Sequence, residues 1–390
     1  MSRRIAIIGV GSTACRALTP DVSYRELVYE AAVKAYEDAG VDPRKDIQSF
    51  VTAAEDCIEG ISITDCYTPD QLGAALRPVQ TVTADGIHGL ITAYMQILTG
   101  ALDVAAVAVF SKASNMLTPE DCLLFAFDPI LNRPLNFNPY CIAGMEMNRY
   151  LHDTGTTKEQ CALVTVKNKG NALDNPNAAH GARISVEHVL NSETNFYPLS
   201  RLDVSPPADG AIIMVLASEE AAKALSQKPV WIRGVGWASD TFSLETRDWD
   251  GASYATLAAD MAYKMAGITQ PRREIDLVEI DDTFSYKELQ HLESLRLCRR
   301  GEAGFLVESG ATGKDGEIPV NLSGGSLGIG HLGEAMGMQR ALEVVLQLRG
   351  EAGKRQVANA TTGLAHSWRG IPTTSGAVIV LSTEEQRRHR

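Results

Sequence analysis

The sequence predicts an α/β protein made of two equivalent halves, and two observations support this fold class. Apolar, β-branched runs of strand length alternate with longer segments in which apolar residues recur every three to four positions. This alternation is typical of α/β folds with mixed, mainly parallel sheets and helices between and around them. The second observation is an internal repeat, because IAIIGVG at 5–11 reappears as VWIRGVG at 230–236.

The repeat continues downstream of both segments. YEAAVKAYEDAGVDPRKDIQSFV is echoed by AADMAYKMAGITQPRREIDLVEI, so that Pro43 matches Pro271. A period this long excludes a solenoid of short repeats and indicates a duplicated fold. We therefore expect an N-terminal half at 1–229 and a C-terminal half at 230–390. The first half would include an insertion at 111–229 that carries substrate-binding loops.

Local patterns predict the individual elements. Residues 24–40 form an amphipathic helix that ends with Gly40 at its C′ position, and 86–99 form a second helix that ends before Gly100. Further helices are expected at 142–154, 158–173, 218–225, 252–266, 284–297 and 333–349. Strands are expected at 5–10, 46–53, 79–83, 103–110, 211–217, 230–236, 275–280, 317–321, 356–360 and 377–382.

A glycine pattern near the N-terminus has two possible interpretations. GVGSTA at 9–14 fits the GxGxxA form of dinucleotide-binding turns. In such sites a helix opens on the last small residue, whereas here a loop that ends at Pro20 follows. The echo GVGWAS at 234–239 indicates instead that these glycines serve a turn repeated at two strand ends.

Composition and charge exclude several classes of protein. The chain has 390 residues, of which 45% are apolar, so it can bury a large core. A net charge of −12 argues against nucleic-acid binding, and no apolar run approaches the length of a membrane span. The seven cysteines form no CxxC pair or zinc spacing, and no export signal precedes them. We therefore expect reduced thiols, no metal site and a cytoplasmic location.

The segment VQTVTADGIHGLITAYMQILTG at 79–100 reads as a strand, a turn and a helix. Such a junction can present a reactive side chain, but Thr83, Ala84 and Asp85 stand on it and no Cys or Ser does. Asp85 can cap the following helix or act as a partly buried base, and His88 lies one turn further on.

Several ordered motifs resemble one family. VNLSGGSLGIGHLGEAMG at 320–337 resembles the signature NxSGGxxxxGHPxGxxG, with Leu332 where Pro is usual. VEIDDTFSYKELQHLESLRLC at 278–298 resembles the NEAFA-type region in its HDxF form, and 147–178 and 202–221 match the same branch. Together these motifs resemble the thiolase superfamily, in the sterol-carrier-protein and archaeal (acetyl-CoA acetyltransferase-like) branch, over essentially the whole chain.

The resemblance implies a thiolase-like fold and chemistry on coenzyme A thioesters. It places Thr83 where the family has its nucleophilic Cys, His331 on the motif histidine and His366 on a histidine near the C-terminus. Asp281 and Asp282 stand where the family has Asn or His. As a pair they could share a proton, or Asp282 could cap a helix. The substrate-binding candidates are Asp85, His88, Met145, Gly324, Gly325 and Gly376.

The resemblance also implies partners. The coenzyme A thioester is the substrate and no bound cofactor is expected. A homodimer is expected, together with a small zinc-ribbon/OB-fold partner protein that carries its own zinc.

Three functions remain open at this point. The first is thiolase-type acyl transfer on a 3-oxoacyl-CoA, which the retained Gly-His loop favours but which needs a nucleophile. Loop cysteines could supply one, namely Cys57, Cys66, Cys122 or Cys141. The second is Cys-independent retro-aldol cleavage of a 3-hydroxyacyl-CoA, which needs a base and an oxyanion hole. The third is a non-catalytic subunit of a complex.

Overall fold

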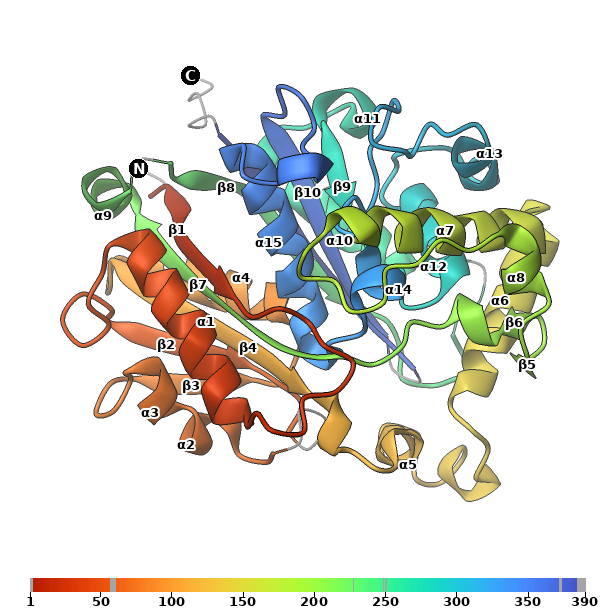
Figure 1. The fold of residues 1–390 in the computed structure, drawn as a ribbon, viewed down its shortest axis with the longest axis horizontal. Coiled ribbons are helices and arrows are strands. Elements are labelled where there is room, and N and C mark those ends of the chain that lie inside the picture. Colours follow the sequence, from red (N-terminus) through yellow and green to blue (C-terminus); the bar gives the residue numbers. More distant parts are fainter. Residues whose placement is uncertain are drawn as a thin grey trace.

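The computed structural model describes residues 3–56, 61–226, 228–247, 249, 251–371 and 374–383. Its centre is a nine-stranded sheet with the strand order β3-β2-β4-β7-β1-β8-β11-β10-β9 (Figure 1). The strands are β1 (Ile5–Ser12), β2 (Ser49–Ala53), β3 (Val79–Val82), β4 (Val104–Lys112), β7 (Asp209–Ser218), β8 (Val230–Ser239), β9 (Leu277–Glu279), β10 (Thr362–Arg369) and β11 (Ser375–Ser382). A separate hairpin pairs β5 (Thr194–Phe196) with β6 (Leu199–Ser200).

The sheet is mixed, but it is not mainly parallel as the sequence suggested. Among the described strands, β2 pairs in parallel with β3 and β4, and β9 with β10. All other recorded neighbours in the sheet are antiparallel. For one of these pairs the reason lies in the sequence, because β10 ends at Arg369 and β11 begins at Ser375, and so short a connection can join only antiparallel neighbours.

Two expected strands are absent from the described sheet. Residues 317–321 contribute only an isolated bridge between Val278 and Val320. Residues 356–360 lie before β10, which begins at Thr362. Both segments contain apolar or β-branched residues, but neither finds a continuous partner strand.

Helices cover both faces of the sheet (Figure 1). Helices α4 (Gly86–Leu98) and α15 (Met336–Arg349) pack against each other and against one face. On the other face, α1 (Tyr24–Ala39) packs on β1, β7 and β4, and α10 (Ser253–Ala266) packs on β8 and β11. The remaining helices are α2 (Thr64–Tyr67), α3 (Pro69–Leu72), α5 (Pro119–Leu124), α6 (Tyr140–Thr154), α7 (Lys158–Asn171), α8 (Val186–Leu190), α9 (Glu219–Leu225), α11 (Pro271–Glu274), α12 (Ser285–Ser294), α13 (Ala303–Glu308) and α14 (Gly325–Ile329).

The sequence repeat has a counterpart in equivalent packing. Gly9 lies inside β1 and Gly234 inside β8, rather than in strand-end turns as expected. A Cβ atom on Gly9 would lie 2.5 Å from the carbonyl oxygen of Ala35 in α1, and one on Gly234 would lie 2.1 Å from that of Ala262 in α10. Glycine therefore lets each outer helix approach its strand closely.

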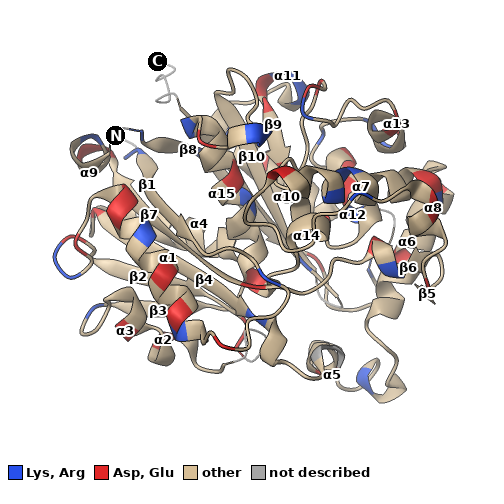
Figure 2. Ribbon diagram, in the orientation of Figure 1, with Lys and Arg blue, Asp and Glu red and all other residues tan. Residues whose placement is uncertain are grey.

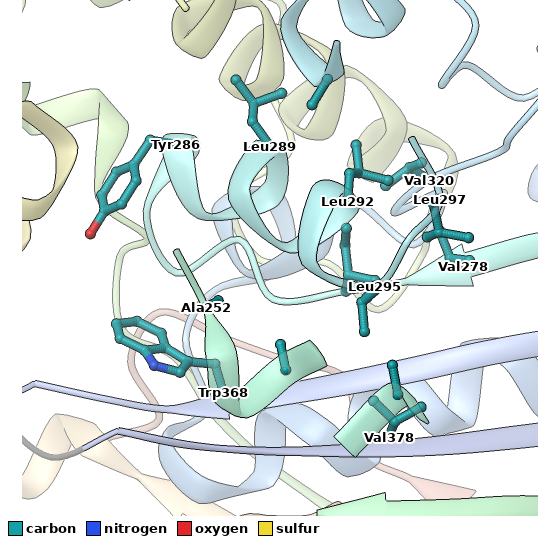
Figure 3. Packing of buried hydrophobic residues seen from close by; sticks show 14 of the residues in the cluster. Ala252, Val278, Tyr286, Leu289, Leu292, Leu295, Leu297, Val320, Trp368 and Val378 are labelled. Atoms are coloured by element: carbon teal, nitrogen blue, oxygen red, sulfur yellow. The ribbon is translucent and has the colours of Figure 1, made fainter. Parts of the chain in front are cut away.

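A large apolar cluster fills the space between the second half of the sheet and its outer helices. Figure 3 shows Val378 of β11 with Leu292 and Leu295 at the end of α12, and Trp368 of β10 with Tyr286 of α12. All five side chains are buried. This packing holds the end of β10 in place, and residues there line the candidate site described below.

The segment expected as an insertion, 111–229, is divided by the structure. Residues 209–218 form β7 between β4 and β1 in the sheet. The segment before β7 carries α5 to α8 and the small hairpin, and α7 packs against α12 and α14 (Figure 1).

Charged residues of both signs are spread along the described chain. Figure 2 shows Lys and Arg interspersed with Asp and Glu along the ribbon. Within the described ranges, no helix has both the length and the apolarity that crossing a membrane requires.

Candidate active site

A cavity of about 140 Å³ lies where the ends of several strands meet. Glu55 follows β2, Thr283 follows β9, and Arg369 ends β10. His331 and Glu334 line the same cavity from the loop between α14 and α15. In open α/β sheets, ligands bind outside the carboxyl ends of the strands, so this is the expected place for a site.

The backbone around His331 is held on both sides. Its N–H donates to the carbonyl oxygen of Pro206 at 2.6 Å, and its own carbonyl oxygen accepts from the N–H of Ala208 at 2.9 Å. In the side chain, Nδ1 accepts from the N–H of Gly333 at 3.1 Å. We assign the neutral tautomer from this bond, which leaves the ring proton on Nε2.

The surroundings keep the His331 ring neutral. Burial lowers the pKa of His331 to about 4, with Asp281 opposing the shift and Arg340 adding to it. Near neutral pH the ring therefore offers an Nε2–H donor, not a second positive charge. Such a donor can stabilise an oxyanion that forms on a substrate.

Arg369 connects three segments at the mouth of the cavity. Its Nη2 forms an ion pair with Glu55, and its Nε lies 3.9 Å from Oε1 of Glu334. Its Nη1 donates to the carbonyl oxygen of Thr83 at 3.4 Å. Burial lowers the pKa of Arg369. The cavity thus contains two carboxylates within reach of one guanidinium.

Aromatic side chains form the apolar part of the cavity wall, namely Tyr140, Phe284 and Trp368. Trp368 is fixed from both sides. Its Nε1 donates to Oγ1 of Thr374 at 2.6 Å, and Nζ of Lys287 lies 4.3 Å from the centre of its ring. This wall can contact an acyl chain while the opposite wall carries the charges.

The first strand–helix junction lies beside the cavity but does not line it. Thr83 is exposed, whereas Asp85 is buried. Oδ1 of Asp85 accepts from the N–H of Ile87 at 2.8 Å, and Oδ2 accepts from the N–H of Gly337 at 2.9 Å. Asp85 therefore caps α4 and also binds the first turn of α15. Burial raises the pKa of Asp85.

His88 extends from α4 below this junction. Its Nδ1 is buried and has no hydrogen-bond partner among the described residues. Burial lowers its pKa, with the nearby Asp85 opposing the shift. It is not among the residues that line the cavity.

Asp281 lies directly behind the cavity wall. Its Oδ1 accepts from the N–H of Thr283 at 2.9 Å, and its Oδ2 lies 2.7 Å from Nη2 of Arg340. Arg340 lies on α15, and Thr283 follows the end of β9. Asp281 itself is 1% exposed. Asp281 thus acts on the cavity through Thr283 and through the field that it exerts on His331.

Asp282 points to another part of the structure. Its Oδ1 accepts from the N–H of Ser326 at 2.6 Å, and its Oδ2 accepts from the N–H of Leu327 at 3.2 Å and from Nδ2 of Asn168 at 2.8 Å. The carboxylate therefore caps α14, and it also shares a partner with Asp281, because Nη2 of Arg340 lies 3.8 Å from Oδ1 of Asp282. Burial raises the pKa of Asp282 to about 6.

His366 is fully buried in β10 and does not line the cavity. Neither of its ring nitrogens has a hydrogen-bond partner among the described residues. Its ring lies 4.4 Å from that of His291, measured between ring centres. Burial and the neighbouring His291 hold the pKa of His366 well below its usual range.

A fully buried polar network continues behind His366. Tyr254 and Nε2 of His291 are joined by a 2.9 Å hydrogen bond, and Lys287 lies 2.9 Å from Glu146. Burial lowers the pKa of Lys287 to about 8. These groups are separated from the cavity by Trp368, whose ring covers Lys287.

The remaining substrate-binding candidates lie away from the cavity. A Cβ atom on Gly325 would lie 2.1 Å from Oδ2 of Asp282, and one on Gly324 would lie 2.5 Å from Cβ of Ala172. Both glycines also have positive φ, so close packing of α14 accounts for them. Gly376 packs against Tyr254. Met145 lies on α6, and its side chain is 54% exposed.

The cysteines differ in their positions. Cys122 of α5 lines the cavity, whereas Cys66 is exposed and Cys141 lies on α6 beside Met145. Cys57 lies outside the described residues. Within the described part of the chain, no group of three His, Cys, Asp or Glu side chains is arranged to hold a metal ion.

Three charged residues of the cavity were not found from the sequence, namely Glu55, Glu334 and Arg369. Glu55 and Arg369 come from segments far apart in the chain and carry no motif. Glu334 did have a signal, because the signature GHPxGxxG has Gly where this chain has Glu334.

Comparisons with known proteins agree on one family. A family model described as "Thiolase C-terminal domain-like" matches residues 236–383. An acetyl-CoA acetyltransferase of Methanothermobacter thermautotrophicus is 35% identical over 97% of this chain and 99% of that protein. A 17-hydroxy-3-oxo-4-pregnene-20-carboxyl-CoA lyase of Mycobacterium tuberculosis is 28% identical over 97% of this chain and 100% of that protein. A solved structure entitled "Ltp2-ChsH2(DUF35) aldolase" superposes with a TM-score of 0.83 and 25% identity, over 99% of each chain.

Proposed function

Because the chain belongs to the thiolase superfamily, we propose that it breaks or forms a carbon–carbon bond in an acyl-CoA without a cysteine nucleophile. The reaction proposed is retro-aldol cleavage of a 3-hydroxyacyl-CoA. One observation carries this choice: at the junction where the family has its nucleophile, Thr83 is exposed and the Asp85 carboxylate caps two helices.

The chemistry at that junction disfavours thiolysis. A threonine hydroxyl is a weak nucleophile near neutral pH unless a base lies within hydrogen-bond reach. The recorded contact of Thr83 in this region is with Arg369, which donates to the Thr83 backbone carbonyl and is not a base. Retro-aldol cleavage needs only a base for the 3-hydroxyl and a donor for the enolate oxygen, and the cavity offers both kinds of group.

His331 fits the role of the donor. With Nδ1 bound by the N–H of Gly333, its Nε2–H is available to bind the thioester oxygen as negative charge develops there. When the hydroxyl proton is removed, the C2–C3 bond breaks. The electron pair of that bond passes to the enolate. Protonation at C2 then gives a shortened acyl-CoA, while C3 becomes the carbonyl carbon of a ketone or aldehyde.

The size of the cavity suits the reacting carbons rather than a whole substrate. Its volume is about 140 Å³, and a groove of about 650 Å³ adjoins it at Tyr140. The groove also includes Pro206, whose carbonyl holds His331, and Arg201, which can bind a phosphate. We assign the coenzyme A arm to this groove.

Thiolase-type acyl transfer on a 3-oxoacyl-CoA is the second candidate. Its support is Cys122, which lines the same cavity as His331, and the 35% identity to an acetyl-CoA acetyltransferase. In this reaction the Cys122 thiolate would attack the C3 carbonyl, and the C2–C3 bond would break. The released enolate would take up a proton at C2 to give acetyl-CoA or a 2-substituted homologue. The thiol of coenzyme A would then attack the acyl group and displace the Cys122 thiolate.

The proposed assembly is a homodimer with a small partner protein. The edge strand β3 has a sheet neighbour on one side only within the described chain, which leaves an edge open to a second copy. The solved aldolase whose title joins Ltp2 to ChsH2(DUF35) supports a second component. The proposed partner is a zinc-ribbon/OB-fold protein that carries its own zinc.

Product analysis tests this proposal. The purified protein is incubated with 3-hydroxyacyl-CoAs and, separately, with 3-oxoacyl-CoAs plus coenzyme A, and products are identified by liquid chromatography and mass spectrometry. Retro-aldol cleavage predicts a ketone or aldehyde and a shortened acyl-CoA from the first set. Turnover of the second set alone, abolished in C122S, would instead establish the second candidate.

A further inference from the structure

We propose that Glu334 is the catalytic base of the cavity and that Arg369 is its positioning residue. This inference rests on the proposed retro-aldol reaction and assigns the one role that the reaction still lacks. Glu334 is not identified by the signature, which has Gly at this position.

The location of Glu334 is fixed by the backbone on either side. It lies three residues after His331, whose N–H is bound by the carbonyl oxygen of Pro206 at 2.6 Å. Three residues later, the N–H of Gly337 is bound by Oδ2 of Asp85 at 2.9 Å. The short loop between these two points therefore holds the Glu334 carboxyl and the His331 ring at the same cavity, as a base and an oxyanion donor require.

The Glu334 side chain is 11% exposed, so solvent reaches it mainly through the cavity. A carboxylate in such a place is stripped of much of its hydration, which makes it a better proton acceptor than one at the surface. The same partial burial lets it contact a hydroxyl on a substrate that fills the cavity.

Arg369 acts unequally on the two carboxylates. It forms a close ion pair with Glu55, whereas its Nε lies 3.9 Å from Oε1 of Glu334. A close ion pair favours the charged form and weakens a carboxylate as a base. Glu55 thus offsets part of the guanidinium charge, and the Nε of Arg369 faces Glu334 at a distance from which it can orient the carboxyl group.

The sequence supplies an independent observation. In the alignment that the resemblance implies, the chain departs from the family pattern twice near one cavity, with Thr83 at the Cys position and Glu334 at a Gly position. The first change removes a nucleophile, and the second adds a carboxyl group three residues from His331. The pair of changes fits a switch from covalent catalysis to general-base catalysis.

The proposed step balances without a further reactant. The Glu334 carboxylate takes the proton of the 3-hydroxyl, the C3–O bond becomes a carbonyl, and the C2–C3 bond breaks. The electron pair forms the C1–C2 enolate, and the Nε2–H of His331 binds its oxygen. The Glu334 carboxylic acid then returns its proton to C2 and becomes a carboxylate again.

Four variants test this assignment. E334Q keeps the shape of the side chain without the base, E334D shortens it, and E334G restores the residue of the signature. E317Q is the matched control, because Glu317 is an exposed carboxylate paired with Arg272. On a 3-hydroxyacyl-CoA that the unaltered protein cleaves, E334Q and E334G should lower kcat by roughly 10²–10⁴-fold with KM changed less than about threefold. E317Q should match the unaltered protein.

Chemical rescue distinguishes a base from a structural group. Formate or acetate can enter the space left in E334G and should raise the kcat of this variant at least tenfold. In E334Q the glutamine side chain fills that space, so the added carboxylate should leave kcat unchanged. R369Q should raise KM and lower kcat moderately, because it leaves the carboxyl in place but less well oriented. Thermal unfolding of each variant reports whether the fold is intact.

The outcomes separate this inference from the function on which it rests. If the unaltered protein cleaves the substrate while E334Q and E334G stay within threefold of it, Glu334 is not the base and the retro-aldol reaction stands. A large loss in E334G with an intact fold and no rescue by formate would also overturn the assignment. If the unaltered protein cleaves no 3-hydroxyacyl-CoA, both the function and the base are refuted.

Discussion

The two junctions that lead into α4 and α15 occupy similar places beside the same cavity, yet they differ in what their polar groups contact. At the first, both oxygens of Asp85 accept backbone N–H groups, one from α4 and one from α15. At the second, His331 uses Nδ1 within its own loop and lines the cavity, as does Glu334. In the proposed reaction, the first junction therefore supports the structure and the second supplies the reactive groups.

The comparison shows how a shared scaffold can change its chemistry. A buried carboxylate whose oxygens are bound by two helices has little capacity left to move a proton. A histidine that is anchored through one nitrogen has the other available for a substrate. Four substitutions test this difference.

Removing the second junction's donor should have the largest effect on turnover. We expect H331A to lower kcat by roughly 10²–10³-fold, the usual loss when one oxyanion donor is deleted. Steady-state kinetics on a 3-hydroxyacyl-CoA measure this effect, with H152A as control because His152 is 82% exposed in its side chain. A kcat within threefold of the unaltered protein would remove His331 from the site.

Removing the first junction's carboxylate should mainly affect stability. D85A loses the cap of α4 and leaves the N–H of Gly337 unbound, so the free energy of unfolding should fall by roughly 2–4 kcal/mol. Urea unfolding measures this loss. S23A is the control, since Ser23 caps α1 alone at an exposed site and should cost about 1 kcal/mol. Equal losses in the two variants would contradict the bridging role of Asp85.

The neutral state of His331 predicts how stability depends on pH. Its pKa is about 4 in the folded protein and about 6.5 in an unfolded chain, so the unfolded state binds more protons between these values. His331 therefore makes the protein less stable as pH falls from 7 towards 4.

The variant H331Q cannot take up this proton. Its melting temperature should fall less between pH 7 and pH 5 than that of the unaltered protein, while Asp281 and Arg340 remain in both. Thermal unfolding across this range measures the difference. Parallel curves would show that the His331 ring is not held neutral.

Changing Thr83, the residue that the resemblance aligns with the family's nucleophile, should have the smallest effect. T83A keeps the backbone carbonyl that accepts from Arg369, and we expect kcat to change less than about twofold. Kinetics under the same conditions as for H331A provide the measurement. A hundredfold loss would show that the Thr83 hydroxyl takes part in the reaction.

Much of the fold could be predicted from the sequence because its signals are local. The glycine-containing strands and the helices after them repeat, and the structure places Gly9 and Gly234 in equivalent contacts with Ala35 and Ala262. The strand pairing could not be predicted in this way, since β1 joins β7 and β8 from distant parts of the chain. The apolar segment around Val320 likewise depends on distant partners, and it makes one bridge and no strand.

Among the residues that line the candidate cavity, the sequence could indicate only those that belong to a motif. The Gly-His signature located His331, but the strand register decides what a residue on β10 can reach. His366 is buried beside His291, whereas Arg369 at the end of the same strand lines the cavity. Glu55 reaches the cavity from β2, and no local pattern in the sequence relates it to Arg369.

Intact-protein mass spectrometry shows directly whether the reaction proceeds without a covalent acyl-enzyme, as we propose. The protein is incubated with acetyl-CoA and with a set of 3-oxoacyl-CoAs, quenched in acid, and any adduct is mapped by peptide analysis. We expect an unchanged mass under conditions in which a 3-hydroxyacyl-CoA is cleaved. A stoichiometric acyl adduct on Cys122 or Thr83 would contradict this expectation and would establish a thiolase-type mechanism.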